Sequence, residues 1–367
     1  MWLKNITLLN FKNYSDAELH FSETVNVFTG NNGSGKTNML DAIHYLCLCK
    51  SYFNPIDSQQ IKTNEEVFMI QGDFERNEKN EKISCGVKRN QKKQFKRNKK
   101  EYDKLADHIG LFPVVMVSPY DVNLIMEGSE ERRKFIDNVI SQTDAHYLDQ
   151  LITYNRILLN RNALLKQIAI TRKYDPALLE ILDEQLVIAG NKIFTIRKAF
   201  MDEFIPLFNQ YYTYLTENKE VVELNYQSQL NEATFEELLK KSVEKDRVLE
   251  RTTTGIHKDE LAFVISGMPL KKFGSQGQQK SFLIALKIAQ YAYLANNKGF
   301  KPLLLLDDIF DKLDDHRVQK LMQMVSHHDF GQIFITDTGK ERIKSIFEKI
   351  EVDVTLFEVD NGTIENA

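Results

Sequence analysis

The order of hydrophobic and polar positions predicts an α/β start to the chain. Apolar residues alternate with polar ones at Ala17, Leu19 and Phe21, which indicates a strand with one buried face. A short apolar run over residues 25–28 predicts a further strand that ends at Gly30. After the following glycines, apolar residues recur at helical spacing over residues 39–47. The first 50 residues are therefore expected to fold as strand, strand, loop and helix.

The middle of the chain has a helical pattern. Apolar residues recur every three or four positions over residues 147–168 and again over 182–200. Between these two series, Asp175 and Pro176 form a typical helix start, with an N-cap residue followed by proline at the first helical position. We therefore expect two long antiparallel helices, joined near residues 170–175, that form an arm in a separate lobe.

The α/β pattern returns from about residue 250. We expect strands at 261–265, 303–306 and 333–336, and helices at 278–296 and near 315–325. The expected organisation is a first α/β part at 1–122, a helical lobe at 123–249 and a second α/β part at 250–367.

Composition excludes several classes of protein. The 48 Lys and Arg against 52 Asp and Glu give a net charge of −4, so nucleic-acid binding would need local basic patches. The three cysteines form no CxxC pair, which argues against a disulfide framework or a structural zinc site. No apolar run reaches the roughly 20 residues of a membrane span, and the first ten residues lack the parts of a secretion signal. We expect a reduced, cytoplasmic protein that does not bind membranes.

The strongest motif is a glycine-rich loop between the strand at 25–28 and the helix behind it. Its pattern is GxxxxGKT, formed by Gly30, Asn31, Asn32, Gly33, Ser34, Gly35, Lys36 and Thr37. In such a loop the backbone N–H groups point at phosphate oxygens, the lysine reaches the β- and γ-phosphates, and the threonine hydroxyl binds Mg²⁺. A chance glycine turn is the alternative, and the strand–loop–helix context disfavours it.

A second motif is the apolar run 303–306 that ends at Asp307 and Asp308. Asp307 is placed to hold Mg²⁺, and Asp308 to orient or deprotonate an attacking water molecule. A buried strand that meets a solvated acidic turn is the alternative interpretation.

Ser275, Gly277 and Gln278 lie at the start of the expected helix at 278–296. Small residues and a serine at a helix N-terminus can bind an anion. Taken alone, the segment is more consistent with a simple N-cap.

A basic run covers residues 88–100, where eight of thirteen residues are Lys or Arg. We expect it at the tip of a hairpin. The run is consistent with DNA phosphate contacts or with an ordinary solvated hairpin.

Together these motifs resemble the ABC-type ATPases of the SMC/Rad50/RecF group, and within it the RecF family of bacterial recombination and repair proteins. Further segments that carry the resemblance are 9–14 (LNFKNY), 118–121 (SPYD), 254–259 (TGIHKD) and 274–279 (GSQGQQ). The matching segments are spread over nearly the whole chain in the order expected for that family.

The resemblance implies an α/β ATPase head built from both chain ends, with a mainly helical lobe inserted between them. It implies ATP and Mg²⁺ as cofactors, with Lys36 and Asp308 in hydrolysis and Thr37 and Asp307 at the metal. It also implies an ATP-dependent homodimer in which Ser275, Gly277 and Gln278 of one subunit contact the nucleotide of the other.

The implied function is ATP-dependent DNA binding at single-strand gaps, in cooperation with RecO and RecR, to help load RecA. A weak, DNA-stimulated ATPase is expected. The alternative from the same group is a structural DNA tether of the SMC or Rad50 kind, which needs a far longer coiled coil than the 123–249 insert supplies.

The sequence departs from the group pattern at several places. Thr336 and Asp337 stand where ABC transporters have a sensing histidine. The acid after the metal-binding aspartate is Asp308, where ABC ATPases commonly have Glu. Residues 311–314 (DKLD) replace the usual SELD, which puts in doubt the dimer contacts made by that Ser and Glu.

Overall fold

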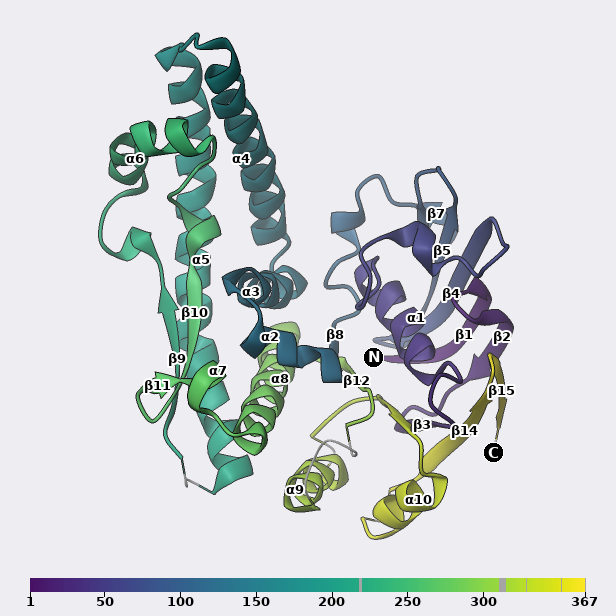
Figure 1. Ribbon diagram of the computed structural model, residues 1–367. Coiled ribbons are helices and arrows are strands. Elements are labelled where there is room, and N and C mark those ends of the chain that lie inside the picture. The colour runs from purple at the N-terminus through teal and green to yellow at the C-terminus, as the bar shows by residue number, and fades with distance from the viewer. Residues whose placement is uncertain (218–219, 310–314, 328, 351, 367) are drawn as a thin grey trace. The chain divides into compact units, whose positions relative to one another are not determined.

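The chain divides into two compact units, and residues 1–217, 220–309, 315–327, 329–350 and 352–366 are described in the computed structural model (Figure 1). Unit 1 consists of Met1–Val122, Tyr211–Glu217 and Gln276–Ala367, and unit 2 of Asn123–Gln210 and Asn218–Ser275. The expectation of one unit built from both chain ends, with an inserted mainly helical lobe, is confirmed.

The second unit boundary differs from the expected one. It falls after Ser275 rather than after residue 249. The reason is strand pairing, since β10 (Glu260–Ile265) is antiparallel to β9 (Val222–Gln227) and therefore stays with the insert.

A six-stranded, mostly parallel sheet forms one layer of unit 1, in the order β15-β14-β3-β13-β12-β8. Only β15 runs antiparallel to its neighbour. The strands are β3 (Val25–Thr29), β8 (Val114–Val117), β12 (Leu303–Leu306), β13 (Ile333–Asp337), β14 (Val354–Asp360) and β15 (Thr363–Asn366). β3, β12 and β13 are buried along their whole length, as expected for parallel strands that are covered on both faces.

The second sheet of unit 1 is antiparallel, in the order β2-β1-β4-β5-β6-β7. Its strands are β1 (Trp2–Phe11), β2 (Tyr14–His20), β4 (Val67–Arg76), β5 (Lys79–Lys88), β6 (Gln94–Arg97) and β7 (Lys100–Glu101). In β5 the buried residues alternate with exposed or half-buried ones, so one face of this sheet packs on the core.

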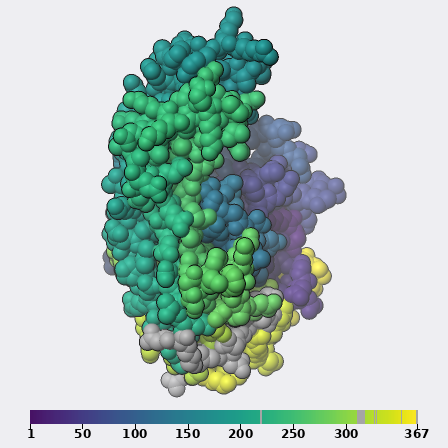
Figure 2. Space-filling model, turned by 60° about the vertical axis from the view of Figure 1, so that its left-hand side comes forward, coloured from purple at the N-terminus to yellow at the C-terminus, as the bar shows by residue number. Residues whose placement is uncertain are grey.

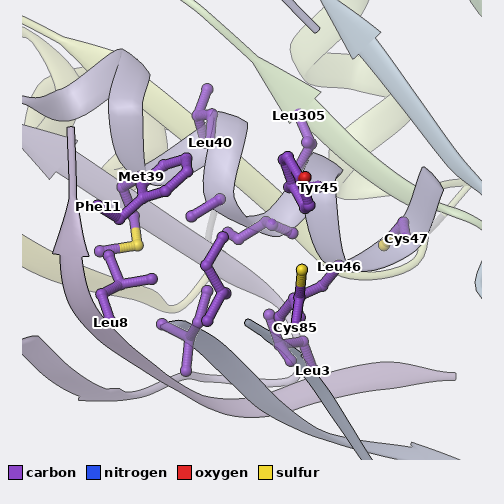
Figure 3. Packing of buried hydrophobic residues seen from close by; sticks show 14 of the residues in the cluster. Leu3, Leu8, Phe11, Met39, Leu40, Tyr45, Leu46, Cys47, Cys85 and Leu305 are labelled. Carbon is purple, nitrogen blue, oxygen red and sulfur yellow. The ribbon is translucent and has the colours of Figure 1, made fainter. Parts of the chain in front are cut away.

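Helix α1 (Lys36–Leu48) lies in the core that these sheets share. Eleven of its thirteen residues are buried, so the helix is enclosed on nearly every side. Figure 3 shows Leu40 and Leu46 of α1 among side chains from both sheets, such as Leu3 of β1 and Leu305 of β12. The loop that leads into α1 is thus anchored on a rigid element.

Among the described residues, three further helices lie wholly in unit 1. They are α8 (Gln276–Lys298), α9 (Asp315–Ser326) and α10 (Lys340–Glu348), with short 3-10 turns η1 (Asp57–Gln60), η2 (Leu105–Asp107) and η3 (Pro119–Val122).

Unit 2 is mainly helical. It contains α2 (Asn123–Met126), α3 (Ser129–Thr143), α4 (Ala145–Thr171), most of α5 (Pro176–Thr216), η4 (Gln229–Asn231), α6 (Phe235–Leu249), η5 (Ile256–Lys258), α7 (Leu270–Phe273) and the sheet β11-β10-β9, with β11 at Met268–Pro269. The long helices α4 and α5 lie side by side and antiparallel (Figure 1). Asp175 Oδ1 accepts a hydrogen bond from the N–H of Ala177 at 3.0 Å, so the predicted helix start at Asp175 and Pro176 is confirmed. Within the described residues, no helix is both long and apolar enough to cross a membrane.

Candidate nucleotide-binding site

The glycine-rich loop connects β3 to α1, and its backbone adopts conformations that need glycine. Gly30, Gly33 and Gly35 have φ angles of 150°, 81° and 123°. A Cβ atom on Gly30 would lie 2.2 Å from the carbonyl oxygen of Val359, and one on Gly35 would lie 2.5 Å from Asn13 Nδ2. The loop therefore packs closely against its surroundings and leaves no room for side chains at these two positions.

The loop ends at the N-terminus of α1, where Gly35 is the N-cap and no side chain caps the helix. The N–H groups of a first helical turn have no partner inside the helix, and the helix dipole makes this end positive. An uncapped helix start behind a glycine loop is suited to binding an anion.

Lys36 is buried, and its ammonium group lies over the loop. Nζ donates to the carbonyl oxygens of Gly30 at 2.7 Å and Asn31 at 2.9 Å. The charge is thus held close to the loop, while Asn31, Asn32 and Gly33 remain exposed to solvent.

Asp307 follows β12 directly and is only 4% exposed. Its Oδ1 accepts hydrogen bonds from the hydroxyl groups of Thr37 and Thr336, each at 2.8 Å. Burial raises the pKa of this carboxyl, and the two hydroxyl groups oppose that rise. The structure thus brings together Thr37 and Asp307, which are 270 positions apart in the sequence.

Thr37 and Asp307 fit a magnesium ion by their chemistry. Hydroxyl and carboxylate oxygens are the hard donors that Mg²⁺ prefers, and this ion commonly uses one or two protein ligands beside water and phosphate oxygens. In the described part of the chain, no group of three or more His, Cys, Asp or Glu side chains gathers as a metal site. A site with few protein ligands is consistent with that finding.

Asp308 is half-buried beside this pair. Its backbone has a left-handed φ of 46°, and its N–H donates to Thr336 Oγ1 at 2.9 Å. Thr336 therefore touches both acidic residues, by its hydroxyl to Asp307 and by its oxygen to Asp308. Asp adopts this left-handed region more readily than most residues with a side chain.

Two hairpins, β1–β2 and β14–β15, support the glycine loop from outside. Asn13 Nδ2 donates to the Ser34 carbonyl at 2.8 Å, and the buried Tyr14 hydroxyl donates to the Gly35 carbonyl at 2.8 Å. From the β14–β15 hairpin, the Gly362 N–H donates to the same Ser34 carbonyl at 3.0 Å. Three contacts thus hold two consecutive carbonyl groups on the outer side of the loop.

These supporting residues and Thr336 were missed as site residues from the sequence. The 9–14 segment was noted only for its resemblance, and 336–337 only for the lack of a histidine. A hydroxyl at the carboxyl end of a parallel strand next to β12 was a signal for Thr336, because ligand sites gather at that edge of a sheet.

Ser275 is exposed and immediately precedes α8, while Gly277 and Gln278 lie in its first turn. Ser275 is the last residue of unit 2, and Gly277 and Gln278 belong to unit 1. Residues 311–314 lie outside the described residues. The basic run 88–100 covers the end of β5, a turn, β6 and the turn to β7, so its expected place on a hairpin is confirmed.

The fold and this site define a class of protein. The family model of the RecF/RecN/SMC N-terminal domain matches residues 2–365. An Smc head domain from Pyrococcus furiosus has the same fold, with a TM-score of 0.58 at 15% identity over 100% of this chain and 96% of that one. The protein thus has the fold of an ABC-type ATPase of the SMC kind.

Closer relatives narrow the class. The chain is 51% identical over 357 residues to the DNA replication and repair protein RecF of Flavobacterium johnsoniae, which covers 97% of this chain and 99% of the relative. It is 49% identical over 365 residues to RecF of Bacteroides fragilis, with 99% and 98% covered. A solved structure of the recombination mediator protein RecF-ATP in the RecFOR pathway superposes with a TM-score of 0.90 at 30% identity, over 100% of this chain and 97% of that one. The chain belongs to the RecF family.

Proposed function

We propose that the protein is an ATP-dependent DNA-binding factor of replication and recombinational repair. The observation that carries the proposal is the glycine loop with Lys36, joined to Asp307 through Thr37, in a chain about half identical to proteins named for DNA replication and repair. The ATP named with the solved RecF structure supports ATP as the nucleotide.

In this proposal the glycine loop binds the phosphates through its backbone N–H groups. Lys36 exchanges its contacts with the Gly30 and Asn31 carbonyl groups for phosphate oxygens, so its charge is already in place before the nucleotide binds. A magnesium ion held by Thr37 and Asp307 would neutralise phosphate charge. Asp308 orients or deprotonates the attacking water molecule. Its side chain is one methylene shorter than that of the Glu common in ABC ATPases, so we expect slow hydrolysis.

We propose further that ATP drives the formation of a homodimer and that hydrolysis releases it. Ser275 is exposed and precedes α8, so it is accessible to a second copy of the chain, where it would contact the nucleotide. By this account the dimer acts at single-strand gaps in DNA with RecO and RecR. The RecFOR pathway named with the solved RecF structures supports these two partners.

A structural tether of the Rad50 kind is disfavoured by the length of the arm. At about 1.5 Å per residue, the 27 residues of α4 span about 40 Å. The 41 residues of α5 span about 60 Å. Neither helix approaches the length of a chromosome-bridging coiled coil.

Nucleotide-dependent sedimentation tests the proposal. The wild type should sediment as a dimer with Mg²⁺ and ATP and as a monomer with ADP. Ser275→Arg should stay monomeric while it still binds ATP, because a long cation blocks the contact across the dimer. Lys36→Met should neither bind ATP tightly nor dimerise.

The matched control is Asn296→Arg, which adds the same side chain to the exposed far end of α8. It should dimerise like the wild type. Equal dimer populations with ATP and ADP, or dimers of Ser275→Arg, would contradict the proposed switch.

A further inference from the structure

The segment 88–101, here called the basic hairpin, is the most concentrated positive region of the sequence. It carries eight Lys or Arg residues and a single acid, Glu101, in a chain whose net charge is −4. It lies at the open edge of the antiparallel sheet of unit 1, where β6 pairs with β5 and the two-residue β7 ends the sheet. The nucleotide-binding loop does not use it.

Three of its basic side chains hold the hairpin to the body of unit 1. Lys93 Nζ donates to the Cys49 carbonyl at 2.7 Å and pairs with Asp57 at 2.9 Å. Arg97 pairs with Glu81, and Arg89 Nε donates to the carbonyl of Glu65 at 3.1 Å. These three residues have structural partners, and the charges of Lys93 and Arg97 are compensated by carboxylates.

Four other lysines are exposed: Lys88, Lys92, Lys99 and Lys100, here called the exposed lysine set. In the described part of the chain, none of their ammonium groups has a hydrogen-bond or ion-pair partner. The remaining lysine, Lys96, is only half-exposed and lies opposite Glu101 across the β6–β7 pair. We therefore leave Lys96 out of the set.

The backbone at the β6–β7 turn holds a lysine in a left-handed conformation. Asn98 and Lys99 have φ angles of 51° and 70°. Two consecutive left-handed residues define a tight hairpin turn in which glycine is preferred at the second position. A lysine there is less stable than the glycine that the turn favours.

A second unfavourable feature lies next to this turn. Lys100 is the direct cross-strand partner of Arg97, and like charges that face each other across a strand pair are destabilising. Two independent local costs thus accompany Lys99 and Lys100, whose ammonium groups have no partner among the described residues. Local instability that serves no fold contact is typical of a binding surface.

The one aromatic residue of the hairpin points away from solvent. Phe95 is 1% exposed and packs in the core with Cys85, its cross-strand partner. No aromatic side chain of the hairpin is therefore available to stack on a base, which disfavours a surface for unpaired bases. Exposed lysines without aromatic neighbours are suited to the phosphates of a nucleic-acid backbone.

We propose that the exposed lysine set binds the phosphate backbone of duplex DNA without reading its sequence. The proposal rests on the proposed function, because it takes DNA as the ligand, and it adds the surface and the mode of contact. The hairpin would hold the double-stranded part of a gapped substrate, with Arg89, Lys93 and Arg97 fixing its position.

The test is the salt dependence of binding to a fluorescent DNA duplex, with ATP present. Each phosphate contact contributes about −0.9 to the slope of log K against log salt concentration. Replacing all four lysines with glutamine should make the slope less negative by roughly three to four and weaken binding at least tenfold at about 0.1 M salt.

The matched control removes four exposed lysines of unit 2: K192Q, K240Q, K241Q and K245Q. This variant has the same net charge as the hairpin variant and should bind like the wild type. If both variants lose affinity equally, the effect is one of total charge and the proposal is wrong.

The variant Lys99→Gly separates the effect of the lysine charge on DNA binding from the effect of the turn on stability. Glycine relieves the strained turn, so the urea midpoint should rise, while the loss of one phosphate contact should weaken DNA binding severalfold and reduce the slope by about 0.9. Unchanged DNA affinity in Lys99→Gly and in the fourfold variant would overturn the proposal while leaving the proposed function intact.

Two other outcomes also overturn it. Lysines on an edge strand can serve only to prevent edge-to-edge association, and a fourfold variant that aggregates but binds DNA normally would show that role. A wild-type protein that does not bind DNA with ATP would refute the proposed function itself, and the hairpin proposal with it.

Discussion

At the scale of single residues, the hydroxyl of Tyr14 holds the glycine-rich loop from outside. It is buried and donates to the Gly35 carbonyl at 2.8 Å. Burial raises the pKa of Tyr14 well above its ordinary value, so the hydroxyl keeps its proton and stays a donor. With this carbonyl held on the outer side, the neighbouring N–H groups are free to face a phosphate.

We predict that Tyr14→Phe weakens ATP binding. One net hydrogen bond contributes about 0.5–1.5 kcal/mol, so the Kd for ATP should rise roughly 2- to 10-fold. Isothermal titration calorimetry measures this Kd. Tyr45→Phe is the control, since the Tyr45 hydroxyl is also buried but donates to Asp57. It should lower the thermal midpoint about as much as Tyr14→Phe without changing the Kd.

If the two variants have the same Kd for ATP, Tyr14 only stabilises the fold. A Kd that changes in Tyr14→Phe while both thermal midpoints fall together would establish the positioning role.

The sequence predicted the glycine loop and the Asp307–Asp308 pair because each motif is continuous in the chain. Their roles as ligands stay predictions, although the Thr37–Asp307 contact agrees with them. The contacts of Tyr14, Thr336 and Gly362 could not be predicted in this way. Each depends on which strands lie side by side, and strand order is a property of the folded sheet.

At the scale of elements, unit 2 contains a buried ionic network around Arg197 of α5. The guanidinium is 1% exposed. It pairs with Asp137 of α3 at 2.7 Å and with Asp259 at 2.8 Å, and donates to the Ile256 carbonyl at 2.8 Å. One side chain thus joins a long helix, a second helix and the loop before β10.

We predict that Arg197→Met destabilises the protein by about 3–5 kcal/mol, because it leaves the buried carboxylate of Asp259 and the half-buried one of Asp137 without their cation. Urea unfolding measures the change. Lys134→Met is the control, since its pairs with Glu130 and Glu131 are exposed and an exposed pair contributes at most about 1 kcal/mol. If Arg197→Met lowers the free energy of unfolding no more than Lys134→Met does, the prediction is wrong.

The long helices were predictable because periodicity over many turns leaves little ambiguity, as at α4 and α5. The short strands β14 and β15 were not anticipated, because a few apolar residues between turns are consistent with many structures. The boundary after Ser275 was also missed, since β10 has the same strand pattern whichever unit it joins.

At the scale of the whole molecule, the buried His44 and His108 and the half-buried His257 make stability depend on pH. Burial lowers the pKa of His44, His108 and His257 to about 4. Each ring has a nitrogen within hydrogen-bonding distance of a carbonyl oxygen, of Lys50, Leu46 and Thr252 respectively, which suits the neutral form with its proton there. These contacts belong to both units.

We predict that the free energy of unfolding falls as the pH drops from 6.5 toward 4. In this window the unfolded chain takes up protons near pH 6.5 while the folded chain does not, so protonation favours unfolding. The slope is about 1.4 kcal/mol per pH unit for each histidine. Burial raises the pKa of Asp183, Asp259 and Asp307, which acts in the opposite direction.

Urea unfolding of the wild type and of His108→Gln at several pH values measures the contribution of this one histidine to the pH dependence of stability. Glutamine can donate to the same carbonyl but does not titrate, so its stability should fall less steeply with acid. His146→Gln, on an exposed residue, is the control. Parallel curves for the wild type and His108→Gln would refute the assignment.

The place of β3 in its sheet bears on how the protein is made. This strand lies between β13 and β14, which leave the ribosome about 300 residues after it. A nascent chain therefore carries its phosphate cradle for most of synthesis with neither flanking strand present, and contacts so distant in sequence form slowly. Competence to bind the nucleotide is consequently acquired last, so prematurely terminated products would lack it.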